Sequence, residues 1–135
     1  MQYAALPFRL KDGRFEILLI RSRETRRWVI PKGWPMRGRK PHRAAQREAY
    51  EEAGVVGRIG KVEIGRYLYP KRLADGTSVP CEVAVFPLPV ARRRRRWPER
   101  AERGKGRWMP PAKAAAAVRE TGLSAIILSL APHGD

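Results

Sequence analysis

Three acidic side chains, Glu48, Glu51 and Glu52, fall within five consecutive positions of the chain. If this segment is a helix, the spacings of three and four residues place the three carboxylates along one edge. Like charges this close repel one another, so the arrangement costs stability unless a cation lies among them. Magnesium prefers a few carboxylates and leaves its other positions to water and phosphate oxygens. The spacing therefore indicates a candidate magnesium site, while a solvated helix face neutralised by Arg43 and Arg47 stays open as the alternative.

Composition limits the number of domains, the partners and the kinds of metal site that this chain can have. The chain has 135 residues, with 29 Lys and Arg against 13 Asp and Glu, and a formal net charge of +16. This length predicts a single domain over residues 1–135, and this charge attracts polyanions such as nucleotides, inositol phosphates or nucleic acid. One cysteine, Cys81, excludes an internal disulfide and a thiolate zinc cluster. Two histidines, His42 and His133, are too few for a histidine-based metal site, which leaves the carboxylates.

The elements around the glutamates are predicted from helix signals. Pro41 suits a first helical turn and Gly54 follows a stretch that ends at Ala53, so we expect a helix over 41–53. Alanines at positions 45, 49 and 53 give this helix a small face that can pack closely on a sheet. The segment 32–40 is rich in Gly and Pro, which predicts an irregular loop leading into the helix.

The rest of the chain alternates between strand and helix patterns. Apolar segments flank turn signals at 11–14 and at 74–77, and each pair predicts a β-hairpin. Pro80, Pro87 and Pro89 predict that the last hairpin strand lies partly at an edge or ends early. Residues 92–104 are expected to form a long exposed connection, followed by helices over 111–120 and 123–130. This order predicts an α/β fold, a mixed β-sheet sandwiched between α-helices.

Two observations bear on location. No apolar run approaches the roughly 18 residues of a membrane-spanning helix, so no membrane partner is expected. The first residues have neither a basic start nor a long apolar segment, so no signal peptide is visible and we expect a cytoplasmic protein. Nothing in the sequence predicts an oligomeric state.

The pattern around the glutamates resembles a known family. Gly33 is followed after thirteen residues by Arg47-Glu48-Ala49-Tyr50-Glu51-Glu52-Ala53-Gly54-Val55, which resembles the Nudix box, G-x5-E-x7-R-E-U-x-E-E-x-G-U with U aliphatic. One fixed position differs, because the first glutamate of the box is replaced by Arg39. The segment 27–35 and Arg107-Trp108 with the following helix are similar to diphosphoinositol polyphosphate phosphohydrolases of this superfamily. The resemblance implies the Nudix fold.

The resemblance also implies an activity. Nudix hydrolases use Mg²⁺, with Mn²⁺ as a substitute, and cleave a pyrophosphate bond by attack of water on phosphorus. The substrate classes implied here are diphosphoinositol polyphosphates, dinucleoside polyphosphates and other nucleoside diphosphate derivatives. The implied metal ligands are Glu48, Glu51, Glu52 and the backbone carbonyl of Lys32, with Arg47 orienting the glutamates through ion pairs. The general base stays open among Glu48, Glu82, Glu99 and Glu102.

Cationic side chains near the motif are candidates for holding the nonreacting phosphates, and a solvated basic loop is their alternative. These candidates are Lys32, Arg21, Arg23, Arg27 and Arg39. The run Arg92 to Arg96, followed by Trp97, is a candidate contact for nucleic acid, because guanidiniums neutralise phosphates and an aromatic ring stacks on bases. A solvated loop is the alternative for this run as well.

Two further functions stay open beside a hydrolase of small molecules. One is a catalytically weak Nudix-fold module that binds phosphorylated ligands or RNA, and the other is an RNA 5′ pyrophosphohydrolase. The reversed charge at Arg39 favours the weak module, whereas the intact Glu48, Glu51 and Glu52 favour an enzyme.

Overall fold

The computed structural model describes residues 1–130, so Pro132 and His133 lie outside the described residues. Within this range the chain forms eight strands and four helices. They are β1 (Gln2–Lys11), β2 (Arg14–Arg21), β3 (Trp28–Val29), β4 (Lys32–Gly33), α1 (Pro41–Ala53), β5 (Val55–Gly57), β6 (Gly65–Arg72), β7 (Ser78–Arg93), α2 (Arg100–Arg103), β8 (Arg107–Met109), α3 (Pro111–Ala117) and α4 (Thr121–Leu130).

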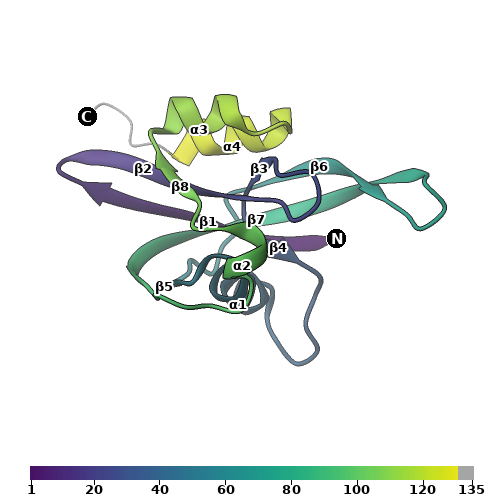
Figure 1. The fold of residues 1–135 in the computed structure, drawn as a ribbon, viewed down its shortest axis with the longest axis horizontal. Coiled ribbons are helices and arrows are strands. Elements are labelled where there is room, and N and C mark those ends of the chain that lie inside the picture. The colour runs from purple at the N-terminus through teal and green to yellow at the C-terminus, as the bar shows by residue number, and fades with distance from the viewer. Residues whose placement is uncertain (131–135) are drawn as a thin grey trace.

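The sheet is mixed and has helices on both faces, as the sequence predicts. Its main path is β3-β2-β1-β7-β5, while β4, β6 and β8 pair with β1, β7 and β2 respectively. β1 and β7 run parallel at the centre, from Gln2 opposite Val83 to Phe8 opposite Pro89, and the other pairs are antiparallel. Figure 1 shows α3 and α4 on one side of the sheet and α1 and α2 on the other.

The first predicted hairpin is confirmed. β1 and β2 pair from Phe8 opposite Ile17 to Lys11 opposite Arg14. The two residues between them, Asp12 and Gly13, have φ angles of 52° and 75°. Positive φ at both central positions is typical of the type I′ turn, whose twist matches the flanking strands.

The proline-based prediction for the second hairpin offered two alternatives, and the structure shows a local edge at the prolines and no early end, because β7 is 16 residues long. Pairing with β6 ends at Val85 and pairing with β5 begins at Val90. Pro87 and Pro89 fall between these points, where β7 has β1 on one side and no regular strand on the other. A strand can therefore hold prolines at the centre of the sheet where a gap in the neighbouring pairing removes the need for their N–H groups.

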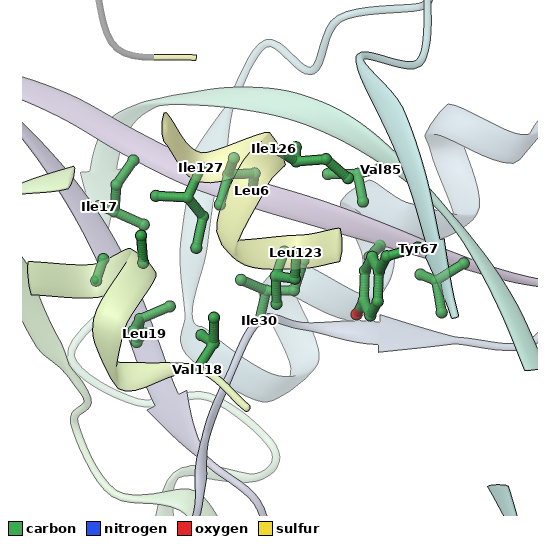
Figure 2. Close-up of a cluster of buried hydrophobic side chains, with 14 of the residues drawn as sticks. Leu6, Ile17, Leu19, Ile30, Tyr67, Val85, Val118, Leu123, Ile126 and Ile127 are labelled. Carbon is green, nitrogen blue, oxygen red and sulfur yellow. The ribbon is translucent and has the colours of Figure 1, made fainter. Parts of the chain in front are cut away.

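Two hydrophobic clusters hold the layers together. On one face, buried side chains of α4 such as Leu123 and Ile127 pack against Leu6, Ile17 and neighbouring strand residues (Figure 2). On the other face, the alanines of α1 pack against Ala5, Leu18, Phe86 and Leu88. Residues 4, 5 and 6 of β1 alternate between the two clusters, as the pleat of a strand requires. The predicted small-residue face of the helix is thus confirmed as its sheet-packing face.

The helix over 41–53 begins and ends where the sequence predicts. Gly54 ends it in the left-handed region, with φ 69° and its N–H donating to the carbonyl of Tyr50. The segment 32–40 departs from the prediction of a continuous loop, because Lys32 and Gly33 form β4 opposite Ala4 and Tyr3. Within residues 1–130 no helix is long and apolar enough to cross a bilayer.

The connection over 92–104 is less exposed and more regular than predicted. Its first two residues belong to β7, and Arg100–Arg103 form α2. The ring of Trp97 packs on Gly54, at a position where a side chain on residue 54 would overlap it. This packing fixes the connection against the end of α1. The helix predicted to run to Glu120 ends at Ala117, because the backbone is extended at Val118 before α4 begins.

Candidate functional site

Gly33 and Glu48 bring β4 and α1 together. A Cβ atom on Gly33 would overlap the carboxylate of Glu48, so only glycine leaves room for this side chain. Glu48 is half-buried there, at the point where β4 passes α1. The glycine of the motif therefore has a steric role, which is to admit the first of the three helix carboxylates.

Burial and mutual repulsion dominate the electrostatics of these carboxylates. Glu52 is 4% exposed, and its burial, together with the charges of Glu48 and Glu99, raises its pKa to about 8 against the opposing effect of Arg103. Burial and the charges of Glu51 and Glu99 raise the pKa of Glu48 to about 7. A nearby cation stabilises the ionised form of such a carboxylate and thereby lowers its pKa.

Glu51 has a different environment from Glu48 and Glu52. The Nε of Arg47 donates a hydrogen bond to its Oε1 at 2.8 Å, an ion pair across one helical turn. The backbone carbonyl of Glu51 accepts a hydrogen bond from the N–H of Glu99 at 2.9 Å. Arg47 is therefore placed to orient Glu51, and the backbone of α1 is tied to the segment that precedes α2.

Glu99 and Arg103 complete the site from a distant part of the chain. The Nε of Arg103 donates to Oε1 of Glu99 at 2.8 Å, and its Nη2 lies 3.7 Å from Oε1 of Glu52. Its Nη1 also donates to the carbonyl of Arg21 at 3.5 Å. We call Glu48, Glu51, Glu52 and Glu99 the glutamate cluster. Sequence reasoning included Glu99 among four alternatives and missed Arg103, although their spacing of four residues is typical of an ion pair on a helix.

The other two acidic alternatives lie in different surroundings. Glu82 pairs with Arg66 at 3.1 Å and its side chain is 44% exposed. Glu102 is exposed, and its backbone carbonyl accepts a hydrogen bond from Arg26 at 2.6 Å. Neither residue contributes to the pKa shifts of Glu48 and Glu52, whereas Glu99 contributes to both.

Of the predicted phosphate-binding residues, Lys32 and Arg23 lie beside the glutamates. The half-buried ammonium of Lys32 lies 4.2 Å from the ring centroid of Tyr69. Burial lowers the pKa of Lys32, while the charges of Glu52 and Glu120 oppose this effect. Arg23 Nε lies 3.9 Å from Oε1 of Glu99. Both cations are therefore close to members of the glutamate cluster.

The remaining three cationic candidates are placed less directly. Arg27 lies 3.9 Å from Glu120. The guanidinium of Arg21 lies 3.7 Å from the Trp28 ring centroid, and its Nη1 donates to the carbonyl of Arg26. Arg39 is exposed in the loop before α1. Phosphate binding by all five cationic candidates stays a prediction.

The arginine run is partly used in packing. Arg93 donates from Nε to the carbonyl of Ala53 at 2.8 Å, and its guanidinium lies 4.7 Å from the Trp97 ring centroid. Arg100 approaches the same ring at 5.4 Å. These contacts and the proximity of Gly54 give Trp97 a structural role, whereas Arg94, Arg95 and Arg96 are exposed.

The donor chemistry fits a hard divalent ion. Carboxylate oxygens are the ligands that Mg²⁺ prefers, and raised pKa values are typical of carboxylates that share one site. Within residues 1–130, no three Glu, Asp, His or Cys side chains converge closely enough to form a ready metal cage. Arg103 instead supplies the cation that contacts Glu52 and Glu99. The residues therefore suit a metal ion in kind.

The fold is an α/β sandwich in which helix α1, with its glutamates, lies beside strand β4 and its Gly33. This arrangement is the one expected for the Nudix fold. The chain belongs to the Nudix family, because residues 2–128 match the NUDIX domain. It is 34% identical over 122 residues to "Nudix hydrolase 18, mitochondrial" of Arabidopsis thaliana, covering 85% of this chain and 66% of the relative. It is 41% identical over 59 residues to diphosphoinositol polyphosphate phosphohydrolase 3-alpha of Mus musculus, covering 44% and 36% respectively.

Solved structures confirm the fold. An Ap4A hydrolase of C. elegans in a binary complex superposes with a TM-score of 0.68 at 18% identity, covering 94% of this chain and 91% of that one. At this identity the likeness concerns the fold alone. The chain spans 66% of the Arabidopsis relative and 36% of the mouse relative. The predicted Nudix resemblance and α/β fold are thus confirmed.

Proposed function

We propose that this chain is a magnesium-dependent Nudix hydrolase that cleaves a pyrophosphate bond in a phosphorylated small molecule, with water attacking phosphorus. The observation that carries the proposal is the contact of the Glu48 carboxylate with Gly33 of β4. Arg103 links the two further carboxylates of the site, Glu52 at 3.7 Å and Glu99 at 2.8 Å. Buried carboxylates with raised pKa values cost stability, and a divalent ion with a diphosphate offsets that cost. Membership of the Nudix family supports the same chemistry.

The helix glutamates would hold the metal. Glu48, Glu51 and Glu52, with the backbone carbonyl of Lys32, are the proposed ligands for Mg²⁺, and Mn²⁺ would substitute. When bound, the ion neutralises the diphosphate and lowers the pKa of a coordinated water. Arg47 orients Glu51 through the 2.8 Å hydrogen bond described above. Gly33 admits the Glu48 side chain.

Glu99 is the best candidate for the general base outside α1. It shares Arg103 with Glu52 and is oriented by that guanidinium, whereas Glu82 is held by Arg66 on another part of the surface. Glu48 is the candidate within the helix, because its carboxylate lies against Gly33 at the proposed metal site. The proposal therefore assigns proton abstraction to Glu99 or Glu48.

Cationic side chains would hold the phosphates that do not react. Lys32 and Arg23 are the first candidates because they lie next to Glu52 and Glu99, followed by Arg21, Arg27 and Arg39. The net charge of +16 would steer anionic substrates toward the protein. Diphosphoinositol polyphosphates and dinucleoside polyphosphates are the leading substrate classes, and the named activities of the mouse relative and the worm structure support both.

A product screen tests this proposal. The protein with Mg²⁺ is incubated with diphosphoinositol polyphosphates, dinucleoside polyphosphates, nucleoside triphosphates and triphosphorylated RNA, and products are separated by chromatography. We expect turnover of at least one small molecule, and a loss of about a thousandfold or more in Glu52→Gln. Glu63→Gln is the matched control, because Glu63 is paired with Arg66 at the surface. Equal activity of Glu52→Gln and the wild type would refute the site assignment.

The same screen separates the alternatives. A catalytically weak module, favoured by the positive charge of Arg39, would bind these compounds without releasing products. An RNA 5′ pyrophosphohydrolase would prefer the triphosphorylated RNA, and the exposed Arg94, Arg95 and Arg96 favour this possibility. Preference for RNA should then fall steeply with salt, because binding of a nucleic-acid chain releases counterions.

A further inference from the structure

Arg103 lies between two glutamates from different parts of the chain. Its side chain is only 12% exposed, and its guanidinium contacts Glu99 at 2.8 Å and Glu52 at 3.7 Å. The third contact, to the carbonyl of Arg21, joins α2 to the end of β2. A guanidinium remains protonated throughout the working range of a protein, so the glutamate cluster contains a permanent positive charge.

This charge stabilises the ionised forms of its neighbours. It opposes the raised pKa of both Glu48 and Glu52, and for Glu52 it is the largest stabilising influence on the ionised form. A divalent ion held by the same carboxylates would supply the same neutralisation. Two cations in one cluster repel each other strongly, because the site is partly buried and poorly screened.

We propose that Arg103 is a built-in competitor of the divalent ion, which neutralises the glutamate cluster when no metal is bound and moves away from Glu52 when the metal binds. The inference rests on the proposed function, since it assumes that the cluster is the metal site. It adds a positioning residue that the Nudix motif does not contain, supplied by α2.

The connections of α2 determine what such a movement would change. Arg103 and Glu99 are paired across one turn, and the N–H of Glu99 donates to the carbonyl of Glu51. Release of Arg103 from Glu52 would remove one link between α2 and α1, while the Arg103–Glu99 pair and the backbone bond from Glu99 to Glu51 remain. Metal binding would therefore loosen α2, and Glu99 would stay attached to α1.

Direct measurement of Mn²⁺ binding tests the proposal without any substrate. The affinity for Mn²⁺ alone is measured by calorimetry at one pH that is the same for the wild type and every variant. We expect Arg103→Gln to bind Mn²⁺ about tenfold or more tightly than the wild type, because a nearby positive charge is removed. Arg103→Lys retains the charge and should bind close to the wild type.

Arg100→Gln is the matched control. It removes a guanidinium from the same helix, where Arg100 contacts Trp97 and the carbonyl of Arg95 but none of the four glutamates. Its affinity for Mn²⁺ should stay within about threefold of the wild type. An equal gain in Arg100→Gln would attribute the effect to net charge and overturn the proposal.

The outcomes distinguish this inference from the proposed function. If the wild type binds Mn²⁺ and Arg103→Gln binds it equally or more weakly, the competition is refuted while the metal site stands. If neither protein binds Mn²⁺, the metal site itself is refuted and the inference with it. Should Arg103→Gln fail to fold, hydrogen exchange of the wild type decides: amides 100–104 should exchange faster with Mn²⁺, and unchanged or slower exchange would overturn the proposal.

Discussion

The carboxylate of Glu48 lies against the backbone of Gly33, in the space that a side chain at position 33 would occupy. This contact links a two-residue strand to the middle of a thirteen-residue helix. It also explains why the chain needs glycine there although no left-handed φ is required. The role of Gly33 in leaving space for Glu48 can therefore be tested by adding a methyl group at position 33.

We expect Gly33→Ala to displace Glu48 and lower kcat/KM by about a hundredfold or more while the protein stays folded. The double variant with Glu48→Gln should lose little more than Glu48→Gln alone, since both changes remove the same carboxylate. Steady-state kinetics of the two single variants and the double variant, compared with the wild type, completes this double-mutant cycle. Additive losses would show that Gly33 acts independently of Glu48.

The stability of the metal-free protein should fall as pH rises. The pKa values of Glu48 and Glu52 are raised from 4.5 to about 7 and about 8, so the folded protein holds protons that the unfolded chain releases. The free energy of unfolding should therefore decline between about pH 5 and pH 8, by at most about 1.4 kcal/mol per pH unit for each group. Urea unfolding in EDTA measures this decline.

Two comparisons check the origin of that pH dependence. Glu52→Gln should show a shallower decline, because one of the two perturbed groups no longer titrates. Saturating Mg²⁺ should restore stability most strongly at the higher pH, since the carboxylates must lose their protons to bind metal. A wild-type unfolding free energy that rises over this range in EDTA would contradict the assigned pKa shifts.

Acidic residues outside α1 should differ sharply in importance. We expect Glu99→Gln to lower kcat by about a hundred- to ten-thousandfold if Glu99 is the general base. Glu82→Gln should retain nearly full activity, because Glu82 pairs with Arg66 and makes no contact with the helix glutamates. Comparable activity of the two variants would transfer the role of the base to Glu48.

Arg39 is the one fixed position of the motif that departs from the Nudix pattern. Its side chain is exposed, and we expect Arg39→Glu to change kcat/KM by less than about tenfold. Arg37→Glu, in the same loop, is the control for charge reversal. A gain of a hundredfold or more in Arg39→Glu alone would show that the natural protein is a weakened enzyme or a binding module.

Gly54 should be important for stability. Its φ of 69° is costly for other residues, and a Cβ there would overlap the ring of Trp97. We expect Gly54→Ala to destabilise the protein by about 1–2 kcal/mol from the backbone alone, with more from the displaced ring. Thermal unfolding measures the total. Gly76→Ala, which also has positive φ but open space around it, isolates the backbone contribution.

The local features of this protein could be predicted from its sequence. The boundaries of α1 follow from Pro41 and Gly54, and its sheet-packing face follows from alanines at intervals of four. The Asp12-Gly13 turn determines the first hairpin in the same way. Each of these depends on residues within a few positions of one another, so the sequence pattern carries the information directly.

The prolines of β7 left two alternatives open because their effect depends on neighbouring strands. Considered alone, Pro87 and Pro89 are compatible with a local edge or with an early end of β7. The pairing of β7 with β1, and the gap between β6 and β5, decide that the strand continues. A strand's tolerance for proline is thus set by which of its two edges needs hydrogen-bond donors at that residue.

The sequence by itself determined the Nudix motif and the three glutamates of α1, because their spacing is a property of one helix. Only the tertiary structure decided that Glu99 and Arg103 join them, since these residues approach α1 through the backbone bond to Glu51 and the packing of Trp97 on Gly54. The choice among Glu82, Glu99 and Glu102 likewise depends on contacts between segments far apart in the chain, which no local pattern records.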